Sequence, residues 1–180
     1  MTGKSIQRIT YRLRQGWSCL RATMHPDRID LGPARQVLDA PAFRLFMRLS
    51  PADRAHGLCV LSALRKHGPW PIEVEQAALL HDIGKIDGGL SLAHRSFVVL
   101  MSAVGAQGLL KRMAGDGQQW RHPFWVQRHH AELGAELCRQ AGCAPLTIEL
   151  VRQHESPLEQ VSDPELLRVL EALQAADSSC

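Results

Sequence analysis

Six prolines, each at the start of a segment with helical spacing of apolar residues, limit what this chain can fold into. A proline is tolerated in the first turn of an α-helix, where its missing amide hydrogen would have no partner, and it breaks a helix interior. Aromatic residues make up only 5% of the chain and β-branched runs are scarce, so strands are disfavoured. The sequence therefore predicts an all-α domain with helices that begin near Pro41, Pro51, Pro71, Pro123, Pro145 and Pro164.

Composition divides the chain into two parts. Residues 1–30 contain a basic amphipathic segment, predicted to be a helix, and a linker, and six basic residues and one acidic residue precede position 29. Residues 31–180 are long enough to bury a core and are predicted to form a single helical domain. The basic helix is either a solvated face or a peripheral contact with an acidic membrane surface. Nucleic acid is not an expected partner, because the rest of the chain is slightly acidic and carries no reading motif.

The five cysteines form no Cys-x-x-Cys pair and are odd in number. We therefore expect no disulfide framework and a reducing, cytoplasmic environment. Cys59 and Cys138 fall in helical segments and are expected to pack as small core residues. The basic N-terminal segment lacks the apolar stretch of a signal peptide, and no segment reaches the ~20 apolar residues of a membrane span.

Polar residues interrupt the core-facing stripes of five predicted helices. In one of them a His-Asp pair ends an apolar run, and a buried carboxylate without a partner costs several kcal/mol. Hydrogen-bonded core histidines are one interpretation, but each would need its own partner. Convergence on one or two metal ions satisfies all of these groups together, and imidazole with carboxylate suits Mn, Fe, Co or Zn, or Mg where oxygen ligands prevail. The candidate ligands are His56, His81, Asp82, His130, His154 and Asp177.

This pattern resembles the HD superfamily of metal-dependent phosphohydrolases. The match lies in a histidine, a His-Asp-Ile-Gly-Lys stretch of the HDIG type and a distant aspartate, and it covers about residues 40–177. The resemblance implies an all-helical HD-type domain, with Lys85 near a substrate phosphate. It also implies that a first metal ion is held by His56, His81, Asp82 and Asp177.

A further part of the resemblance is to the HD-GYP subgroup. His130 begins a His-x-x-x-Gly motif, and in that subgroup this histidine and a later His-His-Glu triplet bind a second metal ion. Here the triplet reads Gln-His-Glu over residues 153–155, so one ion and a loosely held pair both remain open. The Gly-Tyr-Pro signature is replaced by Ser-Pro-Leu at 156–158, so hydrolysis of cyclic di-GMP is not implied.

Residues 88–122 resemble an insertion into the family's pattern. Within it, Arg95 either offers its guanidinium to a substrate phosphate or lies on the solvated side of a packing helix. The candidate catalytic residues are therefore Asp82, Lys85 and Arg95. The expected activity is hydrolysis of a phosphomonoester or phosphodiester by a metal-activated water, with a phosphorylated small molecule, a nucleotide, as substrate. The alternative is a non-catalytic metal-containing module that senses a nucleotide and docks to a membrane through its N-terminal helix.

Overall fold

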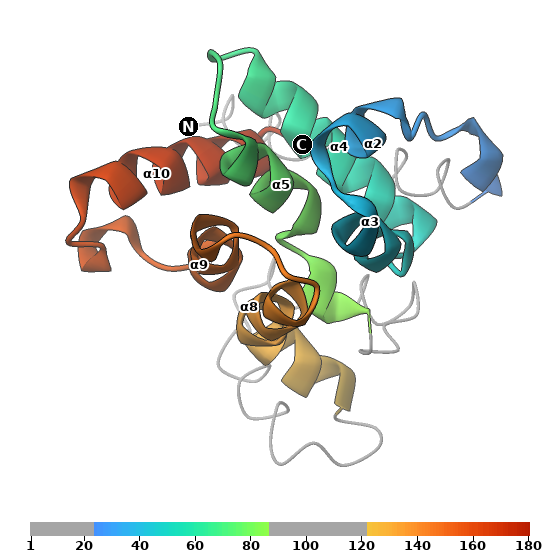
Figure 1. Cartoon of the computed structure of the whole chain (residues 1–180). Coiled ribbons are helices and arrows are strands. Elements are labelled where there is room, and N and C mark those ends of the chain that lie inside the picture. Colours follow the sequence, from blue (N-terminus) through green and yellow to red (C-terminus); the bar gives the residue numbers. More distant parts are fainter. Residues whose placement is uncertain (1–23, 87–121) are drawn as a thin grey trace, which may run out of the picture.

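A computed structural model describes residues 24–86 and 122–180, and within these ranges the protein is all-α, as predicted (Figure 1). None of the helices in these ranges is long and apolar enough to cross a membrane. The predicted basic helix and most of the insertion, including Arg95, lie outside the described residues. The helices are α2 (Gly32–Val37), α3 (Ala40–Met47), α4 (Pro51–Arg65), α5 (Ile72–Leu80), α8 (His122–Gln140), α9 (Pro145–Gln153) and α10 (Pro164–Ser178), with 3-10 helices η1 (Pro26–Arg28), η2 (Ile83–Lys85) and η3 (Leu158–Gln160).

The prolines mark the helix starts as the sequence predicts, and polar side chains beside them cap the free amide groups of α3, α4 and α10. The amide of Asp53 donates to the Oγ of Ser50 over 3.2 Å at the start of α4. Asp163 accepts from the amides of Glu165 and Leu166 at the start of α10. After the ends of α4 and α8, Gly68 and Gly142 have the positive φ angles that favour glycine after a helix.

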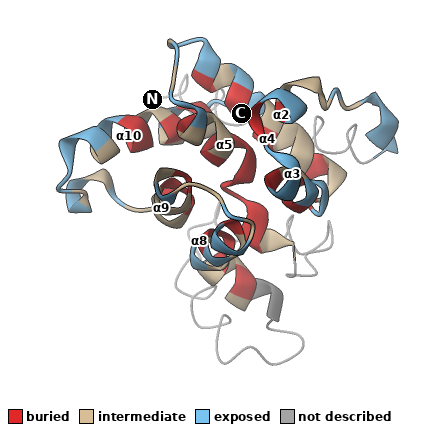
Figure 2. Ribbon diagram, viewed as in Figure 1, coloured by how far each residue is buried: buried red, intermediate tan, exposed pale blue. Residues whose placement is uncertain are grey.

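Helix α5 lies at the centre of the described domain. It packs against α2, α4, α9 and α10, and its last five residues include four that are fully enclosed, so Figure 2 shows it largely in the colour of buried residues. The chain leaves α5 directly into His81 and Asp82, which are themselves buried. A polar pair at this point in the sequence is therefore carried into the interior rather than to the surface.

Helix α8 approaches the turn after α5 so closely that only glycine fits there. A Cβ atom on Gly84 would lie 1.9 Å from the carbonyl oxygen of His130 and 2.7 Å from the amide nitrogen of Gly134. The φ angle of Gly84 is not positive, so the backbone conformation of this turn does not itself require glycine. Its missing side chain instead allows backbone to meet backbone.

The expectation that the cysteine packs as a small core residue is correct for Cys138 and wrong for Cys59, and the expectation that the cysteines stay unpaired is wrong for Cys59 and Cys180. Cys138 is buried, whereas Cys59 is exposed and forms a disulfide with Cys180, with 5.9 Å between the two Cα atoms. The two cysteines are separated by 121 positions in the chain, and spacing in the sequence does not reveal that the end of α10 lies against α4. The bridge also ties the chain just after α10 to α4.

Candidate metal centre

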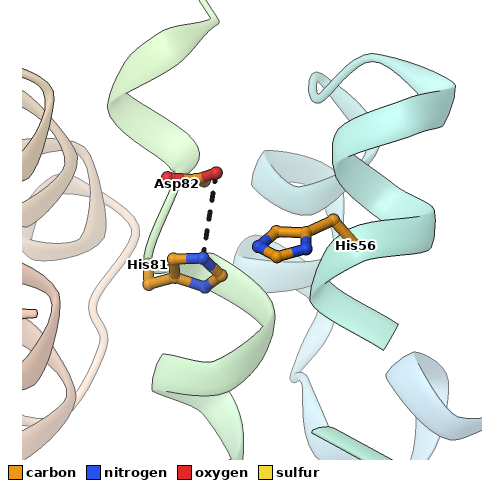
Figure 3. A group of neighbouring side chains, drawn as sticks. All are labelled: His56, His81 and Asp82. Atoms are coloured by element: carbon orange, nitrogen blue, oxygen red, sulfur yellow. Dashed lines mark ion pairs between the residues drawn. The ribbon is translucent and has the colours of Figure 1, made fainter. Parts of the chain in front are cut away.

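The first group of candidate ligands comes from three different helices. Figure 3 shows His56, from the middle of α4, facing His81 and Asp82 at the end of α5. The fourth member is Asp177, in the last turn of α10, whose Oδ1 lies 2.8 Å from Nε2 of His56 and 3.6 Å from Nε2 of His81. The Oδ2 of Asp82 lies 3.8 Å from Nε2 of His81.

The second group lies on the other side of the same aspartate. His130 comes from α8 and His154 directly follows α9, and their Nε2 atoms are 3.1 Å apart. The Oδ1 of Asp82 is 3.6 Å from Nε2 of His130 and 3.9 Å from Nε2 of His154. Asp82 is therefore common to both groups, with one carboxylate oxygen directed to each.

Three of the imidazoles are held in the tautomer that a metal ligand needs. In His81, His130 and His154 the Nδ1 atom lies 3.1, 2.8 and 2.8 Å from the backbone carbonyl oxygen three residues earlier, so Nδ1 carries the proton and donates it. Each Nε2 then presents a lone pair. Between His130 and His154, two such acceptors face each other at 3.1 Å without a proton between them. A cation between the two rings removes this conflict.

The distances between ligand atoms within each group also fit one bound ion per group. Two ligand atoms bound at about 2.1 Å lie about 3.0 Å apart at a right angle and about 3.4 Å apart at a tetrahedral angle. The separations given above run from 2.8 to 3.9 Å. Among the described residues, His56, His81 and Asp82 form one group that could hold a metal ion, and Asp82, His130 and His154 form another.

The charges around Asp82 keep its carboxylate ionised. Burial raises its pKa, but the ammonium of Lys85 and the nearby imidazoles outweigh burial and hold the pKa well below its usual range. The Nζ of Lys85 lies 2.6 Å from Oδ1 of Asp82. Burial likewise lowers the pKa of Lys85, and Asp82 more than compensates, so the pKa of Lys85 is raised. The two side chains therefore form a charged pair.

The histidines divide into neutral and protonatable members. Burial, with the charge of Lys85, lowers the pKa of His130 to about 4, and burial and His81 lower the pKa of His154. His56 behaves differently. Burial lowers its pKa, but its hydrogen bond to Asp177 and the charge of Asp82 outweigh that effect and raise it. The second group thus offers neutral imidazoles at pH 7, which is the form that binds a metal.

All six metal-ligand candidates from the sequence are brought together, and Lys85 lies beside them. Sequence reasoning did not select Glu155, whose Oε1 lies 3.7 Å from Nε2 of His130, although the side chain is 58% exposed. The Gln-His-Glu triplet contained the signal, because Glu155 directly follows a candidate ligand. Gln153, which replaces a histidine of that triplet, donates to Glu149 on its own helix instead.

Comparisons of the chain with protein-family models, with curated proteins and with solved structures found no match.

Proposed function

We propose that this protein is a metal-dependent phosphohydrolase that acts on a phosphorylated small molecule, such as a nucleotide. The observation that carries the proposal is the pair of His/Asp groups that share Asp82, each with ligand separations suited to one ion. Support for the phosphate comes from Lys85 and from the sequence's resemblance to the HD superfamily. The described residues supply imidazole and carboxylate but no thiolate at the site, which suits Mn, Fe, Co or Zn, or Mg.

The residues of the chain have separable roles in this reaction. A divalent ion at this centre would supply Lewis acidity and lower the pKa of a bound water to about 7. Asp82 joins the two groups, and the hydrogen bonds from Nδ1 of His81, His130 and His154 to backbone carbonyls fix the orientation of the three rings. Lys85 places a positive charge beside Asp82, where it offsets negative charge that develops on phosphoryl oxygens.

The test begins with protein purified without chelator, in which bound metals are measured by mass spectrometry. Hydrolysis of a generic phosphomonoester and a generic phosphodiester is then followed with each divalent metal. His130→Ala should lose metal from the second group and lower activity. His129→Ala is the matched control, because His129 lies on the same helix, stacks on Trp125 and has no part in either group. A wild-type protein that contains no metal, or hydrolytic activity that survives Asp82→Ala, would refute the proposed enzymatic function.

The Lys85–Asp82 pair favours a second candidate function. The Nζ of Lys85, 2.6 Å from Oδ1 of Asp82, would hold a nucleotide phosphate beside the metal groups without a reaction, as a metal-containing module that only senses a nucleotide requires. In that case a nucleotide should raise the melting temperature, while no phosphate is released over hours with any divalent metal. Phosphate release in the same samples would exclude the sensor.

A further inference from the structure

The Cys59–Cys180 disulfide lies one helical turn from two members of the first group. On α4, Cys59 follows His56 by three residues. Cys180 lies two positions beyond the end of α10, and its amide donates to the carbonyl of Asp177 over 3.0 Å. Residues three apart on a helix are neighbours on its surface. The bridge and the 2.8 Å contact between Nε2 of His56 and Oδ1 of Asp177 therefore tie the same two segments together, side by side.

Most of α10 is fixed by burial, but its last two residues are not. Leu173 and Ala176 are buried, and the residues after them are exposed or half-buried, with the Asp177 side chain 39% exposed. The final carbonyl groups of a helix have no partners within it, so a last turn frays unless something holds it. Here the amides of Ser179 and Cys180 donate to the carbonyls of Ala176 and Asp177, and the covalent link to Cys59 adds the tie to α4.

We propose that this disulfide is a redox-sensitive latch that keeps Asp177 within the first metal group, so that the oxidised protein binds a metal ion more tightly than the reduced protein. The inference rests on the proposed function in that the first group must bind a metal. His56, His81 and Asp82 are placed by α4 and α5, whose buried residues belong to the hydrophobic core, so we expect them to stay in position without the bridge. Asp177 alone among the four depends on the end of α10.

The latch is open to thiol chemistry, since Cys59 is exposed. A dithiol reductant attacks one sulfur of the bridge as a thiolate, forms a mixed disulfide and releases the other cysteine as a thiolate, which takes up a proton. The second thiol of the reductant then displaces the remaining cysteine, which is protonated in turn. Two electrons and two protons have moved to Cys59 and Cys180, and the reductant leaves as its disulfide. A low-molecular-weight disulfide reverses the exchange.

The experiment measures the dissociation constant of Mn²⁺ alone, chosen because thiolates compete weakly for it. Oxidised and reduced full-length protein are compared after the reagents are removed. We expect reduction to weaken binding about 10- to 100-fold, the range seen when a group that supports a metal ligand is lost. Oxidised glutathione should restore the affinity of the wild type. Cys59→Ser/Cys180→Ser should bind weakly in both states, and Asp177→Asn should bind weakly and ignore the redox state.

Two controls separate the latch from other effects. Cys138→Ala/Cys143→Ala removes the other described thiols and should keep the full redox response. Circular dichroism should show no loss of helix beyond the last turn of α10 after reduction. A larger loss of helix would overturn the latch, since the bridge would then support the whole fold. Equal affinities in the two states, with the bridge verified by thiol labelling, would also overturn it. Failure of the oxidised protein to bind Mn²⁺ would instead refute the proposed metal function.

Discussion

Gly84→Ala adds one methyl group where two backbones meet, and its effect follows from the structure. The new Cβ would lie 1.9 Å from the carbonyl oxygen of His130, whereas ordinary contact begins near 3.4 Å. Helix α8 must then retreat by about 1.5 Å, because a backbone carbonyl cannot rotate away as a side chain does. Metal sites tolerate shifts of only about 0.2 Å in ligand position, so His130 should leave the second group.

The expected result is the loss of one bound metal ion, with the first group retained. The free energy of unfolding should fall by about 3 kcal/mol, at the upper end of the cost of overpacking. Metal stoichiometry by mass spectrometry and urea unfolding measure the two effects.

Gly134→Ala is the matched control, because its Cβ would meet its nearest atoms at 3.1 to 3.2 Å. The helix propensity gained there, about 1 kcal/mol, offsets much of the crowding. The reasoning would be refuted if Gly84→Ala kept the wild-type number of bound metal ions and changed the free energy of unfolding by less than about 0.5 kcal/mol. In that case α8 does not rest on Gly84.

Three further predictions concern charge. The pKa of His130 is about 4 in the folded protein and about 6.5 when unfolded, so the unfolded chain protonates first as the pH falls. Urea unfolding should therefore show the metal-free protein losing up to about 3 kcal/mol between pH 6.5 and 4, with a flatter profile in His130→Gln. Lys85→Met leaves Asp82 buried without its cation and should lower the free energy of unfolding of the metal-free protein by about 3 kcal/mol. Added Mn²⁺ should stabilise this variant more than the wild type. Equal stabilisation of both proteins would contradict the pairing. Because the pKa of His56 is raised, part of this imidazole is protonated near pH 6.5, and Mn²⁺ binding should release that proton. Fewer protons should be released as the pH rises. Calorimetry in buffers of different ionisation enthalpy measures the number.

Local chemistry made much of the fold predictable from the sequence. Ser50 and Asp163 carry side-chain acceptors that cap a helix without help from distant residues, and the helices begin where those residues stand. The periodicity of apolar residues also placed His130 and His154 on buried faces, because a helix fixes which side chains share a side.

Contacts between distant segments were beyond the same reasoning. The roles of Gly84 and Cys59 depend on which helix lies opposite, and neither α8 nor the end of α10 is near them in the chain. Glu155 was missed for a related reason, since its carboxylate reaches the site from an exposed position that no apolar stripe marks. Packing partners, rather than local conformation, decided each of these cases.

The shared carboxylate of Asp82 makes the two groups thermodynamically dependent on each other. An ion at one oxygen withdraws electron density from the other, and it also fixes the side chain that both groups use. Occupancy of one position must therefore change the affinity of the other, and by linkage the effect is equal in both directions. With Asp177 the first group has two carboxylates, while the second has Asp82 alone apart from the exposed Glu155. Titration with a divalent ion should accordingly fill the positions in order, the group near Asp177 first.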